Sequence, residues 1–526
     1  MAISLPNPDS LKIFSLVLLS LLLLPFSLSA LFLSLIAGRN PPFHKSCTSS
    51  PQRRRRTILV TGLGMAKGLT LARSFYLAGH RVIGADFEHP RIPCSGRFSR
   101  SLAAFYRLPR VDGDDNDDSE STKTNTNTNT NKVYSRALRD IIEAENVDLW
   151  VSCSGVASAV EDAQAKEFVE SHTSCKCIQF DVATTAKLHN KRSFATACKK
   201  LGLSVPETHE VTSKRDVHRI LAACAKSESP LRFILKPVGV DDAHRADMTL
   251  LPLATKVETE RHVYGLPISE TSPWILQEYI PGGEEYCTHA LVVRGEVKCF
   301  VVCPSADMLM HYTPVSPASP LWRAMLDFTA EFVRRSARPE DMTGHLSFDF
   351  MASEGMGGDE GRRKKKKKKE KRVFAIECNP RAHTAAVLFD HRGEEAEAMV
   401  RAYLSAVEGT QKGEKTKSLA SAEDSLVVPS NSTRSRYWIG HDVVSLLLYP
   451  GLRWGMGFTG FRCVLAAVLD LVSHVLLWKD GTFEIWDPLP AVLLYHVYWP
   501  LVMIEAWWYG RRWSRINVST TKVFGC

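Results

Sequence analysis

The chain has 526 residues, 44% hydrophobic and 23% charged, which is enough for two to four domains with a substantial core. Its net charge of +9 is local, because Arg53–Arg56 and Arg362–Lys369 together carry twelve positive charges and leave about −3 for the rest. An extended basic surface is therefore excluded, and nucleic acid is not an expected partner.

A hydrophobic segment at residues 13–37 is long enough to cross a bilayer. It holds 25 almost uncharged residues, and about 20 are needed for a span. Positive residues follow it, whereas a cleaved signal peptide has a shorter apolar run behind a positive start. We expect a single N-terminal membrane anchor with the catalytic part facing the cytosol, and a cleaved signal is the alternative. The 13 cysteines form no CxxC pair, which also suits reduced thiols in the cytosol.

Strands and helices alternate in the part that follows. Apolar strands separated by helices indicate a parallel α/β sheet. The expected elements are strands at 57–62, 81–86, 147–153 and 177–180 and helices at 69–78 and 134–145.

Glycines follow the first of these strands. Gly62, Gly64 and Gly68 precede a helix, and Asp86 ends the next strand. The spacing GxGxxxG departs from the dinucleotide fingerprint GxGxxG, so two interpretations stay open. One is a nicotinamide-binding domain. The other is a tight strand–helix turn that binds no cofactor, or binds substrate.

Beyond Lys187 the pattern changes to α+β. The stretch HALVVRGEVKCFVVC alternates on both sides of RGE, which favours an antiparallel pair. The other expected strands are RFILKPV, WILQEYI, LSFDFM and RVFAIECN.

Oxygen-bearing side chains gather on the last two strands. Glu377 and Asn379 lie two residues apart and therefore share a face, and Asp349 joins them if LSFDFM pairs with RVFAIECN. These are ligand types that Mg²⁺ or Mn²⁺ prefers. Arg381 follows, where it could neutralise a transferring phosphoryl group. His383 is a candidate substrate contact, or a residue that only packs behind the loop.

Two lysines and one acidic stretch complete the candidate set. Lys236 ends an apolar strand and Lys191 lies in KLHNKRSF, and either could hold phosphates. The backbone of Glu278–Ile280 could meet an adenine edge, and Glu285 a ribose hydroxyl pair. Each of these signals is weak alone, since solvated side chains and an acidic hairpin give the same pattern.

In this order the motifs resemble the ATP-grasp superfamily over about residues 57–400. The resemblance rests on a glycine-bearing Rossmann-like domain, LHNKRSFATACKKLGLSVP, RFILKPV, ILQEYIPGGEEY, LSFDF and IECNPR. It implies ATP held between two lobes, with Lys191 and Lys236 on the phosphates. It further implies adenine at Glu278, Tyr279 and Ile280 and ribose at Glu285. The metal would lie on Asp349, Glu377 and Asn379, and Arg381 near the transferred phosphate. The stretch VGVDDAHRADMTLLP, after Lys236, is not the usual Gly/Ser-rich loop over the phosphates.

The C-terminal region resembles a smaller group of enzymes within this superfamily. WDPLPAVLLYHVYWP and WSRINVSTTKVFGC look like ATP-grasp ligases of fungal natural-product clusters, of the isoquinoline alkaloid or mycosporine kind. Residues 464–478 and 489–510 are strongly apolar, but ionisable groups such as Glu505 lie inside them. They form either a second membrane span or a buried or interfacial helix pair.

These observations predict a membrane-anchored, Mg-ATP-dependent ligase that joins a carboxylate or vinylogous acid to an amine. The alternatives are a nicotinamide-dependent oxidoreductase and a non-catalytic membrane adaptor. Substrate identities and oligomeric state stay open.

The sequence also predicts how the chain divides into domains. The first part is a tail at 1–12, an anchor at 13–37 and a basic linker at 38–56. A Rossmann-like pre-ATP-grasp domain at 57–181, with a disordered insert at 112–132, is followed by an ATP-grasp domain at 182–408 with a Lys-rich loop at 353–372. A linker at 409–436 and an apolar region at 437–526, which could associate with a membrane, complete the chain.

Overall fold

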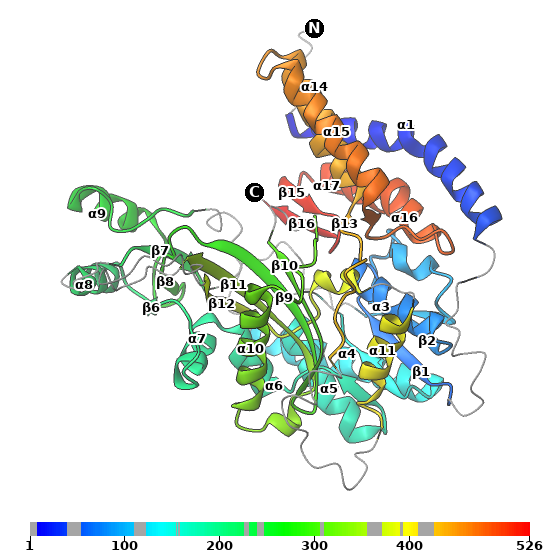
Figure 1. The fold of residues 1–526 in the computed structure, drawn as a ribbon, viewed down its shortest axis with the longest axis horizontal. Coiled ribbons are helices and arrows are strands. Elements are labelled where there is room, and N and C mark those ends of the chain that lie inside the picture. The colour runs from blue at the N-terminus through cyan, green and yellow to red at the C-terminus, as the bar shows by residue number, and fades with distance from the viewer. Residues whose placement is uncertain are drawn as a thin grey trace.

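The computed structural model shows a mixed α/β molecule with an apolar helical region at one end (Figure 1). The described residues are 8–38, 41, 54–109, 123–153, 155, 158–225, 231–238, 247–305, 310–354, 371–389, 393–408 and 426–525. Most of the basic linker and of the Lys-rich loop lies outside them.

The first sheet is parallel and five-stranded, in the order β3-β2-β1-β4-β5. Alternate residues of its strands face two helical layers. Ile58 and Val60 pack towards α3, and Leu59 packs with residues of α4 and α5. The elements are β1 (Thr57–Thr61), α3 (Ala66–Leu77), β2 (Arg81–Phe87), η1 (Ser95–Phe98), β3 (Ala104–Leu108), α4 (Lys123–Glu145), β4 (Leu149–Val151), α5 (Ala159–His172) and β5 (Lys176–Ile178).

Helix α4 begins earlier than the sequence predicted. The Asn/Thr repeat from Lys123 on is helical and not part of a disordered insert. Asn and Thr are poor helix formers, which is why the composition favoured a loop. Once the amphipathic part of α4 is packed, however, each added residue needs no new nucleus.

A small antiparallel sheet follows, in the order β6-β8-β7, and lies with α8 and α9 at one edge of the molecule in Figure 1. Helix α9 begins with a capping box between Thr255 and Glu258, which satisfies free backbone donors of its first turn. The elements are α6 (Val182–His189), α7 (Lys191–Lys200), β6 (Thr208–Val211), α8 (Lys214–Cys224), β7 (Phe233–Pro237), α9 (Lys256–Gly265) and β8 (Trp274–Glu278).

The third sheet is antiparallel and four-stranded, in the order β10-β9-β11-β12. Both predicted pairings are present, β9 with β10 and β11 with β12. Phe348 and Phe350 face a core shared with α10, so Asp349 points to the opposite face. The elements are β9 (Glu284–Val293), β10 (Glu296–Pro304), α10 (Pro320–Arg334), η4 (Pro339–Asp341), β11 (Gly344–Glu354), β12 (Lys371–Asn379), η5 (Thr384–Leu388) and α11 (Glu394–Leu404).

The predicted linker at 409–436 is wrong in its last part. The Val427 N–H donates to the Lys298 carbonyl at 2.9 Å, and the Phe300 N–H donates to the Val427 carbonyl at 3.0 Å. Val427 is buried. This apolar stretch covers the outer edge of β10, whose backbone would otherwise be unpaired.

The C-terminal region is mostly helical and ends in a β-hairpin. A helical hairpin rises from a short parallel pair of strands, β13 with β14, and residues 489–508 form one continuous helix. The elements are β13 (Arg436–Tyr437), α13 (Ile439–Asp442), η6 (Val443–Leu448), α14 (Tyr449–Gly455), α15 (Phe461–Leu477), β14 (Lys479–Asp480), α16 (Leu489–Leu493), η7 (Leu494–Tyr498), α17 (Trp499–Trp508), β15 (Trp513–Asn517) and β16 (Lys522–Gly525).

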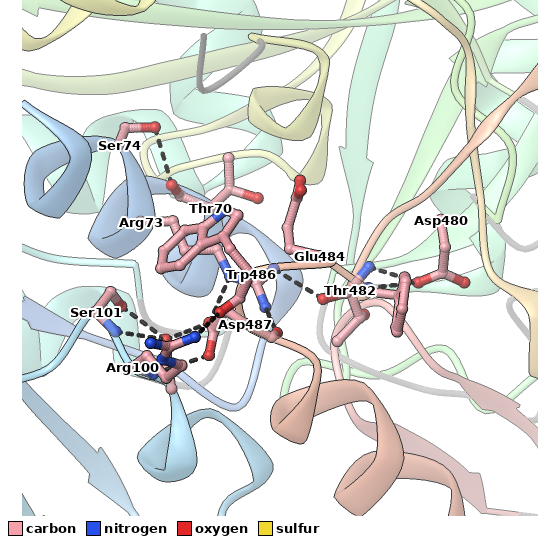
Figure 2. Close-up of polar contacts among 12 residues, drawn as sticks. Thr70, Arg73, Ser74, Arg100, Ser101, Asp480, Thr482, Glu484, Trp486 and Asp487 are labelled. Carbon is pink, nitrogen blue, oxygen red and sulfur yellow. Dashed lines mark hydrogen bonds and ion pairs between the residues drawn. The ribbon is translucent and has the colours of Figure 1, made fainter. Parts of the chain in front are cut away.

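A buried ion pair joins this region to the first sheet (Figure 2). Arg73 of α3 donates from Nε to Asp487 Oδ2 at 2.9 Å, and both side chains are almost fully buried. Its Nη1 donates to the Thr482 carbonyl at 2.7 Å, while the Arg100 backbone N–H donates to Asp487 Oδ1 at 2.8 Å. Buried charges are tolerated only with such partners, so this contact fixes residues 482–487 on the first unit, by which we mean the first sheet and its helices, β1 to β5.

Helix α1 (Pro8–Ala37) packs against the C-terminal helix. The Ser20 hydroxyl donates to the Tyr495 carbonyl at 2.9 Å, and the rings of Phe14 and Trp507 are 5.5 Å apart. Two helical segments, Lys12–Ala37 and Leu489–Trp508, are long and apolar enough to cross a membrane.

Candidate functional site

Three predicted metal ligands lie together on β11 and β12. Asp349 and Glu377 are direct cross-strand partners, and Asn379 donates from Nδ2 to Asp349 Oδ2 at 3.1 Å. A half-turn of the Asn379 amide would present its oxygen instead, since the assignment of its O and N follows the hydrogen bond. Two carboxylates and an amide oxygen then fit a hard divalent ion.

Lys191 and Arg381 border this cluster. Lys191 Nζ lies 3.8 Å from Glu377 Oε2, and the Arg381 backbone N–H donates to the Asn379 carbonyl at 2.8 Å. His189, which the sequence analysis missed, has a lowered pKa because it is partly buried and because Arg381 is near; Glu377 acts in the opposite direction. Positive groups thus stand beside the carboxylates, as a phosphate–metal site requires.

Lys236 lies on the other sheet. It follows the apolar core residues of β7, and its ammonium group donates to Gln277 Oε1 at 3.1 Å. The structure therefore places Lys236 on the β6-β8-β7 sheet and Lys191 beside Glu377 of β12.

Some polar groups of the predicted adenine-binding segment are hydrogen-bonded within the protein. The Tyr279 N–H donates to the Arg232 carbonyl at 2.7 Å, so this donor is already hydrogen-bonded within the protein. The Glu278 carboxylate accepts from the Glu207 N–H at 2.8 Å. Ile280 is buried. These bonds hold the segment between β8 and β9 and leave fewer groups for a base.

Glu285 lies at the start of β9 with an exposed side chain. Its cross-strand partner is Met351, while that of Asp349 is Cys287. Residues two apart share a face, so Glu285 is on the same face of the sheet as Asp349. The register thus places the predicted ribose and metal ligands along one surface.

The loop after β12 positions Arg381 and leaves His383 half-buried. His383 accepts from the Ala385 N–H at 3.1 Å through Nδ1 and so caps η5. Its own N–H donates to His289 Nδ1 at 3.3 Å. Burial lowers the pKa of His383 to about 3, with His289 and Lys67 adding to the effect. Of the two predicted roles, packing behind the loop is the one that the contacts support.

The glycine turn after β1 is tightly built. Gly62 has a φ of +77°, and a Cβ on Gly68 would lie 2.3 Å from the Gly62 carbonyl oxygen. Gly64 donates its N–H to Asp86 Oδ2 at 2.6 Å, and Phe87 donates to Asp86 Oδ1 at 2.8 Å. Asp86 therefore holds the turn together, and the acid that a nicotinamide ribose needs is already bonded.

The C-terminal hairpin reaches this turn. The Ala66 N–H, at the start of α3, donates to the carbonyl of the fully buried Ser519 at 2.9 Å. A helix start is where a Rossmann-type domain receives a pyrophosphate. Protein backbone occupies that donor here, which argues against both the nicotinamide interpretation and a substrate contact at Gly62 or Gly64.

Lys67 was not predicted from the sequence. It lies at the start of α3, is buried, and donates from Nζ to the Ala382 carbonyl at 2.7 Å. Burial lowers its pKa to about 7, and the charge of Arg381 acts in the same direction. In the sequence, its position directly after the glycine-rich turn is the one feature that could have identified it. The Lys67 side chain joins the first unit to the loop that carries Arg381.

A separate cluster lies at the base of the helical hairpin. The buried Asp442 contacts two histidines. His311 Nε2 lies 2.7 Å from Asp442 Oδ1, and His474 Nδ1 lies 2.7 Å from Asp442 Oδ2. These are hydrogen-bond distances, whereas donors around one zinc ion, each about 2.0–2.2 Å from it, stand farther apart. We therefore describe this cluster as a clasp between the hairpin and the loop after β10.

No protein-family model matches the chain, and no curated protein matches it. Solved structures with partial similarity include the L-amino acid ligase from Bacillus licheniformis, at 12% identity over 63% of this chain and 68% of that one, with a TM-score of 0.39. The N5-carboxyaminoimidazole ribonucleotide synthetase from Thermus thermophilus shows 16% identity over 66% and 78%, with a TM-score of 0.42. The biotin carboxylase domain of the Hydrogenobacter thermophilus 2-oxoglutarate carboxylase, solved with MgADP, ADP and bicarbonate, shows 10% identity over 70% and 72%, with a TM-score of 0.43. At such low identities and scores, the function has to be argued from this chain's own residues.

Proposed function

We propose that the chain is a Mg-ATP-dependent ligase of the ATP-grasp type that joins a carboxylate or vinylogous acid to an amine. The observation that carries the proposal is the cluster on β11 and β12. Asp349 and Glu377 are opposed in register, Asn379 is bonded to Asp349, and Lys191 stands 3.8 Å from Glu377. Paired carboxylates with flanking cations are the equipment for handling a metal-bound polyphosphate.

The reaction consists of two displacements. An oxygen of the acid attacks the γ-phosphorus of ATP, the bond to the β-phosphate oxygen breaks, and ADP leaves. The amine then attacks the acyl carbon, the bond to the phosphate oxygen breaks, and phosphate and a proton are released. The product is an amide, or a vinylogous amide from a vinylogous acid.

The chain's own residues bind, orient and neutralise charge. Asp349, Glu377 and Asn379 would hold Mg²⁺, which when bound neutralises phosphate charge. Lys191 and Arg381 would face the phosphates from the β12 side and Lys236 from the other lobe. Lys67 is a positioning residue, because it holds the Ala382 carbonyl directly after Arg381. The acid and amine substrates would lie next to Arg381.

The proposal extends to the domains and to the metabolic setting. Residues 57–181 would be the pre-ATP-grasp domain and 182–408 the ATP-grasp domain. The resemblance of the C-terminal tail to ligases of alkaloid and mycosporine clusters supports a small-molecule acid and an amino acid as substrates. A role in secondary metabolism rests on that resemblance alone.

The test is ADP release by the full-length protein with Mg-ATP and panels of acids and amines, together with product mass. A gain of one amino acid less water names both substrates. Glu377→Gln should lower turnover by about two orders of magnitude or more, because it removes a ligand charge in the transition state. The matched control is Glu284→Gln, an exposed carboxylate on β9 paired with Lys371. Equal turnover in both variants would overturn the proposal, and nucleotide binding without ADP release would indicate a non-catalytic protein.

A further inference from the structure

Three helical segments expose apolar side chains at one end of the molecule. They are α1, the hairpin of α14 and α15, and α17, and all lie in the same part of Figure 1, beyond the sheets. Phe26 of α1 is 74% exposed, Phe458 at the hairpin tip 69% and Trp508 of α17 73%. Helix α15 has no buried residue although its sequence is mostly apolar. We call these exposed side chains the apolar face.

Both ends of helix 489–508 contact the first unit. Its first end follows Asp487, which pairs with Arg73 of α3 at 2.9 Å. Near its last end, Glu505 Oε1 lies 3.2 Å from Nε2 of His89, in the loop after β2. The helix therefore lies along the surface of the first unit.

This attachment is incompatible with a transmembrane orientation of helix 489–508. The hydrocarbon core of a bilayer is about 30 Å thick, so a helix whose two ends both contact the same folded unit cannot have those ends on its opposite sides. The same holds for α1. Near its first end, Lys12 donates to the Ser514 carbonyl at 3.3 Å; at the other end, the Gly38 carbonyl accepts from Arg100 Nη1 at 3.2 Å. Helix α1 therefore lies antiparallel beside helix 489–508.

The hairpin of α14 and α15 also returns to its starting side. Its two ends meet where β13 pairs with β14, so it cannot leave the chain on the far side of a membrane. Arg453 and Arg462 flank its tip, and charged groups are costly in the hydrocarbon core. A shallow position suits both its apolar side chains and these arginines.

We propose that the protein is monotopic, with the apolar face lying in one leaflet of a lipid bilayer and no described helix crossing it. The chemistry of its border favours lipid over a second protein copy. Trp507, Trp508 and Tyr509 stand beside the exposed Arg511 and Arg512, and aromatic rings with arginines are the residues that anchor proteins at the headgroup level. The proposal replaces the single-pass anchor expected from the sequence and does not depend on the reaction.

The first test is topology. The full chain carries one epitope at each terminus in sealed microsomes, which are washed with carbonate and treated with protease. We expect the protein to stay in the membrane pellet while both epitopes are digested without detergent. Protection of the N-terminal epitope until detergent is added would show that α1 crosses. Release of the protein by carbonate would show that the apolar face is not in lipid. Either result overturns the proposal.

The second test measures the hairpin directly. Leu469→Glu on α15 should reduce flotation with phosphatidylcholine–phosphatidylserine vesicles by about tenfold, the effect of burying one leucine. The control Val257→Glu, on α9, changes a side chain of similar exposure, 63% against 59%, and should float like the unchanged protein. Equal flotation of both variants, or a stable dimer that does not float, would overturn the assignment.

A cysteine probe covers the case in which Leu469→Glu fails to fold. Among the described cysteines only Cys463, on α15, is exposed, so an environment-sensitive maleimide can report from the unchanged hairpin. We expect its emission to shift to the blue with vesicles and to be quenched by spin-labelled lipids. The signal of a Cys463→Ser variant is subtracted. A label that stays in water on bound protein would overturn the position of the hairpin.

Discussion

The ammonium group of Lys67 donates a 2.7 Å hydrogen bond to the carbonyl of Ala382, 315 residues further along the chain. This bond joins the start of α3 to the loop that follows the candidate metal ligands. A charged amine in such a buried position carries a desolvation cost, and the position of Arg381 nearby adds repulsion. The first unit therefore takes part in shaping the candidate site without contributing its glycine turn.

Lys67 should make stability depend on pH. Its pKa is about 7 in the folded chain, mainly through burial, against 10.5 ordinarily. Between these values the unfolded chain binds more protons than the folded one, so stability rises with pH. Relative to Lys67→Met, the unchanged protein should gain up to about 1.4 kcal/mol per pH unit above pH 7. Thermal unfolding of both in detergent from pH 7 to 9 measures this, and parallel curves would contradict it.

Lys191 should contribute to nucleotide binding. Its ammonium group stands beside Glu377, whereas the neighbouring Arg192 is exposed and pairs with Glu210. Lys191→Met should weaken Mg-ADP binding by about tenfold, which corresponds to one lost charge-assisted contact of about 1.4 kcal/mol. Arg192→Met is the control and should bind as before. Isothermal titration calorimetry measures the affinity of both variants. An equal loss of Mg-ADP affinity in the two would show that Lys191 does not contact the nucleotide.

Asp487→Asn should strongly destabilise the protein. It leaves the buried guanidinium of Arg73 without its carboxylate, and breaking such a pair costs about 3–5 kcal/mol. The partly exposed pair of Arg219 and Asp216 is the comparison, and Asp216→Asn should cost about 1 kcal/mol or less. The unfolding midpoints of both variants in detergent measure the two losses of stability, and equal losses would contradict the prediction. An Arg73→Met, Asp487→Leu double variant should recover part of the loss.

Gly68→Ala should disturb the glycine turn for steric reasons alone. The added Cβ would lie 2.3 Å from the Gly62 carbonyl oxygen, which is backbone and cannot move aside cheaply. We expect a loss of about 1–3 kcal/mol, as for other overpacked sites. Gly265→Ala, at the end of α9, meets nothing within 4 Å and should be neutral or slightly stabilising. Similar unfolding midpoints for the two variants would contradict the described turn.

The candidate metal cluster was accessible from the sequence because it depends on local rules. Glu377 and Asn379 share a face through the two-residue period of a strand, and Asp349 joins them through one hairpin pairing. The bond from the Tyr279 N–H to the Arg232 carbonyl could not be predicted, because Arg232 lies on a different part of the chain. Lys67 escaped prediction for the same reason, since a lysine on an amphipathic helix carries no sign of burial until its neighbour is known.

The sequence by itself determined the strands, the hairpins and the apolar character of α1 and helix 489–508, because these follow from composition and periodicity over a few residues. Only the tertiary structure decided how those helices are oriented. Asp487 meets Arg73 across 414 positions, and Glu505 meets His89 from a similarly distant part of the chain, and neither contact leaves a local pattern. Hydropathy measures the preference of a segment for lipid, but where its ends are fastened determines whether it can cross.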